Sequence, residues 1–144
     1  MSMASLFGGI ALANAGLGAV HGFAGPLGGM FPAPHGALCA ALLPHVMEIN
    51  LRALQQREPS SPALRRYDEV GRLLTGNAQA NAEAGVQWAR QVVRDLRIPP
   101  LNHYGIQREH FAELTSKAAA ASSMKANPIT LTPQELTMIL EASC

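Results

Sequence analysis

Residues 14–50 of this 144-residue chain read NAGLGAVHGFAGPLGGMFPAPHGALCAALLPHVMEIN. Up to Gly36 the stretch is rich in glycine, and it contains two histidines there, His21 and His35, which lie 14 positions apart. Glycines let other groups approach the backbone closely. In the second half, aliphatic residues recur at roughly helical spacing. The stretch therefore predicts a short helix and a loop that folds His35 back towards His21, followed by a long amphipathic helix that starts at Pro34.

The rest of the chain also favours helices, because Ala, Leu, Arg, Gln and Glu dominate and no clean apolar alternation marks a strand. Ser61 and Gly76 are start and stop signals for one helix, and Thr132 and Glu135 have the spacing of a capping box. Pro44 should kink the long helix. We expect an all-α domain, a bundle of about six helices. A short helix around residue 21 should end between residues 26 and 29, before the long helix. The other helical segments are residues 4–15, 62–74, 81–96, 107–121 and 133–142.

Composition and charge restrict the possible functions. The chain has a formal net charge of +1, so we expect neither nucleic acid nor a membrane as a partner. Only 15% of residues are charged while 48% are apolar, which suggests that the chain buries surface against a second domain or another subunit. The two cysteines, Cys39 and Cys144, do not form a disulfide framework, and a reducing, cytoplasmic setting fits them best.

The apolar run over residues 6–20 has two interpretations. Ala13-Asn14-Ala15 mimics a signal-peptidase site, but no Lys or Arg precedes the run, as a secretory signal requires. The run is also interrupted by glycines and too short to span a bilayer. We therefore expect a buried core helix.

Spacing alone does not make His21 and His35 a metal site. Two ligands are too few to hold Zn²⁺ or Fe²⁺ stably, so further ligands would have to come from elsewhere, and a structural role for both histidines is the alternative. His35 lies at a predicted helix N-terminus, where the dipole favours the neutral imidazole that a divalent metal needs. We expect His45 to be a hydrogen-bonded core histidine, and His103 and His110 to be solvated.

Several sequence words in this region closely resemble the signature of the iron-containing (group III) alcohol dehydrogenases. They are GLGAVHG at 16–22, GGMF at 28–31, PHG at 34–36 and LLPHV at 42–46, and the spacing from the first histidine to PHG also fits. Looser agreement continues through Arg97-Ile98-Pro99 and Asn127-Pro128 to Leu131-Thr132-Pro133, so the resemblance covers nearly the whole chain.

Members of that family have an N-terminal α/β domain that binds NAD(P) and a C-terminal helical domain that holds a metal through one Asp and three His. The resemblance implies that residues 1–144 are a single helical metal-binding domain, with His21 and His35 as two of the ligands to Fe²⁺ or Zn²⁺. The Asp, the remaining His and the NAD or NADP site would belong to an absent N-terminal domain. We accordingly expect no nucleotide-binding residue here: the near-fingerprint at residues 16–21 lacks its third glycine and a preceding strand.

The resemblance also implies a chemistry, in which the metal acts as a Lewis acid on an alcohol or carbonyl oxygen and the nicotinamide exchanges hydride. Phe23 and Phe31 are expected to line the pocket. Many relatives carry a second histidine four residues after the first, and it is linked to catalysis. Gly25 occupies that position here, so the proton-handling group is missing and no other catalytic residue is assigned.

Two functions follow as expectations. The first is the helical domain of a metal-dependent NAD(P) alcohol dehydrogenase, which interconverts alcohols and aldehydes or ketones and is inactive as an isolated fragment. Its partners would be the nucleotide-binding domain, a small alcohol or carbonyl substrate, and further copies of itself in a homo-oligomer. The alternative is a non-enzymatic truncated relative that acts as a helical oligomerisation or binding module, in which the glycines and histidines are inherited packing features.

Overall fold

A computed structural model describes residues 2–144, and every regular element in that range is helical. The expected all-α class is confirmed. The described residues form seven α-helices rather than about six, with short 3₁₀ turns between the later ones. The helices are α1 (Ser2–Ala15), α2 (Ala19–Met30), α3 (His35–Arg57), α4 (Pro62–Thr75), α5 (Ala82–Asp95), α6 (Phe111–Ala120) and α7 (Pro133–Ser143).

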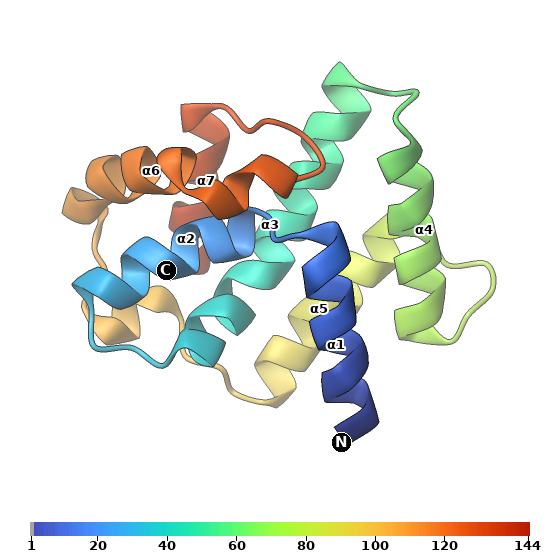
Figure 1. Ribbon diagram of the computed structural model, residues 1–144, viewed down its shortest axis with the longest axis horizontal. Coiled ribbons are helices and arrows are strands. Elements are labelled where there is room, and N and C mark those ends of the chain that lie inside the picture. Colours follow the sequence, from blue (N-terminus) through green and yellow to red (C-terminus); the bar gives the residue numbers. More distant parts are fainter. Residues whose placement is uncertain (1) are drawn as a thin grey trace.

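Helix α3 is the centre of the fold (Figure 1). It packs against α2, α5 and α7, and also touches α4. The main core joins α2, α3, α6 and α7 and includes Phe23, Leu42 and Leu140, which are fully buried. A smaller cluster with Met47 and Val86 joins α3 to α5. Although α3 has the length and hydropathy of a membrane-spanning helix, most of it is buried by the other helices, as expected at the centre of a core.

Local capping signals set several helix ends as the sequence predicted. The Ser61 hydroxyl accepts a hydrogen bond from the backbone N–H of Ala63 at the start of α4, and Gly76 ends that helix in the left-handed conformation, with φ of 68°. At the start of α7, Thr132 and Glu135 form both hydrogen bonds of a capping box. These ends depend only on residues within one turn, which is why they could be predicted.

Helix α2 differs from its prediction. It continues through Pro26 and the following glycine pair as far as Met30, beyond the end expected between residues 26 and 29, so the loop before α3 is shorter than expected. Its buried side, with Phe23 and Leu27, packs on the core, and this packing outweighs the poor helix propensity of glycine. Pro34 is the N-cap of α3 rather than its first helical residue.

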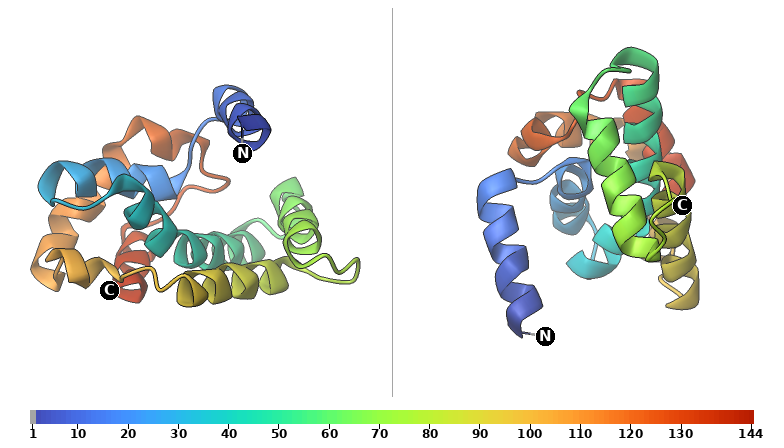
Figure 2. Two further views of the ribbon diagram at one scale, coloured as in Figure 1. Left: turned by 90° about the horizontal axis from the view of Figure 1, so that it is seen from below. Right: turned by 90° about the vertical axis from the view of Figure 1, so that its right-hand side faces the viewer.

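Helix α1 is helical as predicted, but the expectation that it is a buried core helix is wrong: none of its residues is buried. The chain turns at Gly16, with φ of 72°, and α1 and α2 are bent by 102° relative to each other. The bend carries α1 away from the other helices (Figure 2). Leu6 and Phe7 are each 61% exposed. Apolar composition predicted that α1 needs a covering surface, but residues 2–144 do not provide one.

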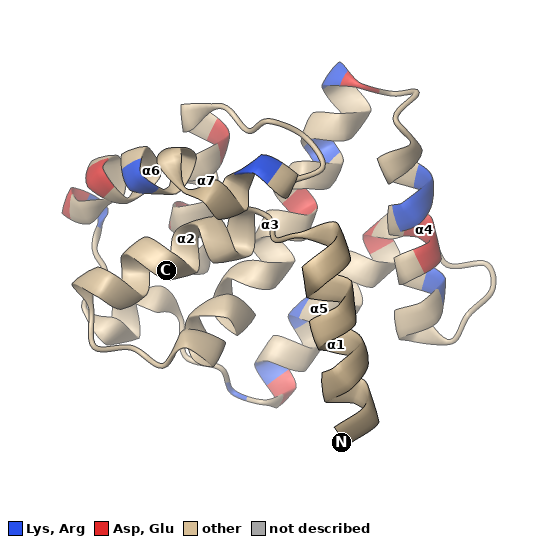
Figure 3. Ribbon diagram, viewed as in Figure 1, with Lys and Arg blue, Asp and Glu red and all other residues tan. Residues whose placement is uncertain are grey.

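The N-terminal third of the chain carries no charged side chain. Glu48 is the first Asp, Glu, Lys or Arg in the sequence. Helices α1 and α2 and the first half of α3 therefore form an uncharged region, whereas α4, α5 and α6 carry both signs (Figure 3). His21 and His35 both lie in this uncharged region.

Candidate metal centre

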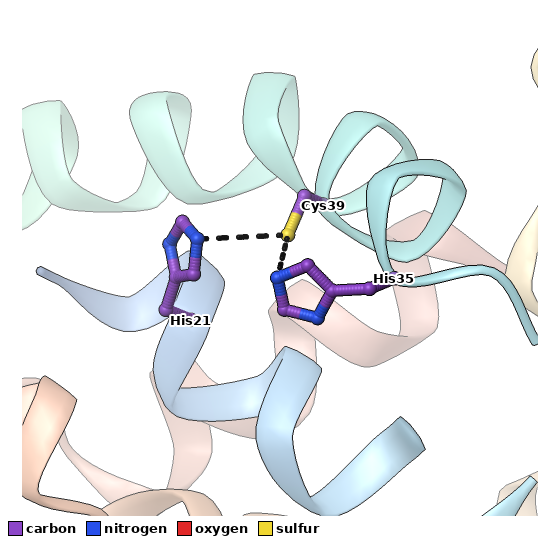
Figure 4. Close-up of side chains that lie close together, drawn as sticks. All are labelled: His21, His35 and Cys39. Carbon is purple, nitrogen blue, oxygen red and sulfur yellow. Dashed lines mark hydrogen bonds between the residues drawn. The ribbon is translucent and has the colours of Figure 1, made fainter. Parts of the chain in front are cut away.

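The structure brings His21 and His35 together and adds a third side chain, Cys39 (Figure 4). The Cys39 sulfur lies 3.4 Å from His35 Nε2 and 3.9 Å from His21 Nε2. The ring centroids of the two histidines are 5.4 Å apart, and the three potential ligand atoms all lie within 4.8 Å of one another. Three donors from two helices thus converge on one point.

The junction of α2 and α3 creates this arrangement. His35 is the first residue of α3, and Cys39 follows four residues later on the same side of the helix. His21 lies in the first turn of α2, which crosses beside α3. Gly22 of α2 faces the Met124 side chain, whose terminal methyl would lie 2.6 Å from a Cβ at that position and would have to move to admit one. His21 and Cys39 are half-buried, and His35 is exposed.

A polar network fixes the start of α2. Gly18 offers no side-chain cap, and instead Asn127 Oδ1 accepts a hydrogen bond from the backbone N–H of Ala19 at 3.0 Å. Asn127 in turn exchanges two hydrogen bonds with Asn50 of α3, at 3.2 and 2.8 Å, and donates to the backbone oxygen of Ile129. Asn50 is only 2% exposed, so this amide pair is a buried link between α2 and α3. Sequence analysis missed it, because Asn127 and Ala19 are 108 residues apart.

A pocket of ≈ 540 Å³ adjoins the three donors. His21 and Cys39 lie in its wall, and Leu43 and Met47 make part of its apolar surface. Tyr67 also lines it, and burial raises the pKa of the Tyr67 phenol despite a hydrogen bond from Asn50. Burial likewise raises the pKa of the Cys39 thiol. The pocket therefore offers a small molecule apolar walls and uncharged groups.

The donor set suits a divalent transition metal. Imidazole nitrogen and cysteine sulfur are ordinary ligands of Zn²⁺, and imidazole also binds Fe²⁺. No carboxylate joins the group among residues 2–144, so these three side chains leave coordination positions free for a ligand from elsewhere. His21, His35 and Cys39 are thus the residues that could hold a metal here.

Gly25 lies on the exposed side of α2, one turn after His21. A Cβ built on Gly25 would meet nothing within 4 Å. Packing therefore does not require glycine at this position, and the surface beside His21 has room for a side chain.

The remaining predicted residues have other surroundings. His45 is half-buried, and burial lowers its pKa. Its Nδ1 is buried without a hydrogen-bond partner in the described chain, so the expectation of a hydrogen-bonded core histidine is wrong. His103 is exposed, as predicted. His110 is not fully solvated, because its ring packs edge-on against Phe31 at 5.0 Å. Phe23 is fully buried in the core. Neither Phe23 nor Phe31 lines the pocket, so the expectation that both would do so is wrong.

Comparison with known proteins identifies relatives over the whole chain. The profile of the Fe-containing alcohol dehydrogenase family, C-terminal, matches residues 1–144. Alcohol dehydrogenase 4 of Saccharomyces cerevisiae is 32% identical over 98% of this chain, and 1,3-propanediol dehydrogenase of Klebsiella pneumoniae is 33% identical over 96%. The chain covers 35% of each of these relatives, about a third of their length.

Solved structures agree with the sequence comparison. A 1,3-propanediol oxidoreductase superposes on 98% of this chain with a TM-score of 0.81 and 27% identity, and the match covers 36% of that chain. The iron-containing alcohol dehydrogenase of Thermococcus thioreducens gives a TM-score of 0.72 at 28% identity, over 94% of this chain and 34% of its own. The fold, the converging histidines and the family profile agree, and the chain belongs to the Fe-containing alcohol dehydrogenase family, whose C-terminal helical part it matches.

Proposed function

We propose that this chain is the metal-holding helical part of an NAD(P)-dependent alcohol dehydrogenase that interconverts alcohols with aldehydes or ketones. The observation that carries the proposal is the convergence of His21 and His35, from two helices, beside an apolar pocket. Histidines that only pack would not need to point their ring nitrogens at one shared position. His21 and His35 are the proposed ligands, and Fe²⁺ or Zn²⁺ is the proposed metal.

The complete enzyme needs a second domain. A nucleotide-binding domain would supply the NAD or NADP site and the missing Asp and His ligands, and the coverage of only 35% of the relatives supports its existence. The exposed apolar surface of α1 supports it as well. The residues described here contain no complete ligand set, so we expect the isolated chain to show little or no dehydrogenase activity. A homo-oligomeric enzyme in the cytoplasm remains part of the proposal.

Within such an enzyme, the residues of this chain would bind and orient the substrate. The metal, when bound, would polarise the substrate oxygen as a Lewis acid. His21 and His35 would hold the metal beside the pocket, in whose wall His21 lies. Leu43 and Met47 would offer an apolar wall to the carbon chain of a small alcohol. Gly25 contributes no proton-handling group, so protons must reach solvent through water or another residue.

Metal binding tests the proposal directly. We expect the chain to bind Zn²⁺ or Fe²⁺ weakly, and His21→Ala to abolish the binding, because removal of one imidazole leaves too few donors. Elemental analysis after equilibrium dialysis measures the metal content. His103→Ala is the matched control, since His103 is exposed and outside the donor group, and it should bind metal like the unmodified chain. Metal content that is unchanged in His21→Ala would contradict the assignment.

The exposed α1 favours the second candidate function, a helical oligomerisation or binding module. Under either function we expect the chain to self-associate, because Leu6, Phe7 and Ile10 expose apolar surface on one short helix. Light scattering should show species larger than a monomer, and replacement of Leu6 and Phe7 by lysine should reduce them. A clean monomer that binds no apolar dye would contradict the expected self-association.

The oligomerisation or binding module becomes the better explanation if self-association occurs while His21→Ala leaves metal content unchanged.

A further inference from the structure

We propose that Cys39 is a third metal ligand, which makes the centre on this chain a two-histidine, one-thiolate site rather than a two-histidine half-site. The inference rests on the proposed metal binding at His21 and His35. It adds a sulfur donor to the centre. Because thiolate is a softer ligand than the carboxylate oxygen of the missing Asp, which it would accompany or replace, the centre should prefer Zn²⁺ to Fe²⁺.

The distances between the donors carry the inference. In a tetrahedral zinc site with ordinary Zn–N and Zn–S bonds, a ligand nitrogen and a ligand sulfur lie about 3.6 Å apart. The Cys39 sulfur lies 3.4 Å from His35 Nε2 and 3.9 Å from His21 Nε2, on either side of that value. Both rings turn the same nitrogen, Nε2, towards the sulfur (Figure 4). The two sulfur–nitrogen distances therefore match two edges of a coordination tetrahedron, and the three donor atoms lie within 4.8 Å of one another.

Helix geometry keeps two of the three donors in register. His35 and Cys39 are four residues apart at the start of α3, and side chains at this spacing lie one above the other on a helix surface. The same spacing brings the two histidines of the His-Glu-x-x-His motif onto one zinc ion. His21 completes the set from α2, across the helix junction.

Hydrogen bonding explains the convergence less well. A thiol has one proton and can donate to only one of the two Nε2 atoms, so the other contact must be a ring N–H pointing at a weak sulfur acceptor. A metal between the three atoms satisfies all of them at once. When it binds, the Cys39 sulfur forms the new bond and its proton leaves to solvent.

The charge distribution also favours a thiolate. No Asp, Glu, Lys or Arg occurs before Glu48, and α1, α2 and the start of α3 are uncharged. Without the Asp that the second domain would supply, two neutral imidazoles leave the double positive charge of a metal uncompensated in these surroundings. Cys39 is the side chain in the donor group that can supply a negative charge.

Cobalt absorption tests the inference, because Co²⁺ bound to thiolate has an intense near-ultraviolet sulfur-to-metal band that imidazole ligands do not produce. The full chain, with its thiols reduced, is titrated with Co²⁺ alone and then with Zn²⁺ in competition. We expect the band in the unmodified chain and in Cys144→Ser, since the Cys144 sulfur lies near Ile106 and outside the donor group. We expect Cys39→Ser to lose the band and to bind Co²⁺ roughly tenfold to a hundredfold more weakly.

The outcomes separate the inference from the proposed function. Co²⁺ uptake that depends on His21 but shows no sulfur band, or a band that persists in Cys39→Ser, overturns the role of Cys39 and leaves the proposed function standing. A chain that takes up no Co²⁺ at all contradicts both. Cys39→Ala, checked for helix content by circular dichroism, replaces the serine variant if that one does not fold, and the same loss of the band is expected.

Discussion

Gly71→Ala is expected to lower the free energy of unfolding by about 3 kcal/mol, the upper end of the usual cost of overpacking. Gly71 is buried where α4 meets the start of α5, and a Cβ there would lie 2.0 Å from the backbone oxygen of Asn81. A backbone atom cannot rotate away as a side chain can. Gly85 of α5 packs against the backbone of Gly71, so the backbones of the two helices meet at a pair of glycines. Alanine at Gly71 must push them apart.

Urea denaturation followed by circular dichroism measures this loss, with Gly28→Ala of α2 as the matched control. Both glycines lie inside helices, so alanine raises the helix propensity at both positions, by roughly 0.5–1 kcal/mol. Gly28 is exposed and has open space around it, so its alanine variant should keep that gain and be slightly more stable than the unmodified chain. Equal stability of the two variants would show that α4 and α5 do not pack through Gly71.

Asn127→Ala is the second large effect that we expect, a loss of about 2–3 kcal/mol in the free energy of unfolding. The substitution removes the acceptor for the Ala19 N–H and both hydrogen bonds to Asn50. Asn50 is almost fully buried, so its amide would lack those partners and could not recover them from water. The start of α2 would also lose its anchor, two residues before His21. We therefore expect metal affinity to fall roughly tenfold, as when an outer partner of a ligand is removed.

Asn77→Ala is the control for this experiment. Asn77 makes a comparable side-chain hydrogen bond, accepting from the Gln79 N–H, but in an exposed turn. The loss of this bond should lower the free energy of unfolding by at most about 0.5 kcal/mol, because water replaces it. Thermal denaturation and the Co²⁺ titration are measured on both variants. If Asn127→Ala is no less stable than Asn77→Ala, the amide pair does not join α2 to α3 as described.

Sequence alone predicted the elements whose signals are local. The serine cap of α4, the glycine that ends it and the capping box of α7 each act within a few residues, and each is confirmed. The extent of α2 was not predicted, because its glycines and Pro26 oppose a helix that is stabilised by packing. The exposure of α1 was not predicted either, since an apolar helix implies a covering surface but not where that surface is.

The candidate site was suggested by a resemblance, and the fold then placed a third side chain, Cys39, beside the two histidines. Spacing alone left His21 and His35 ambiguous, and the motifs around them singled them out. Cys39 was missed, although its position four residues after His35 on a predicted helix was a signal that it would face the same way. Asn127 and Gly71 had no such signal, because their roles come from contacts between helices that are distant in sequence.

The exposure of α1 has a thermodynamic consequence for its partner. A helix of 14 residues with two adjacent glycines, Gly8 and Gly9, and no buried side chain is marginal in water by itself. A surface that covers α1 must therefore also offset the conformational entropy lost when its backbone is fixed. Association and helix formation then become one coupled equilibrium, with a large negative heat-capacity change and a weaker affinity than the buried apolar area alone implies.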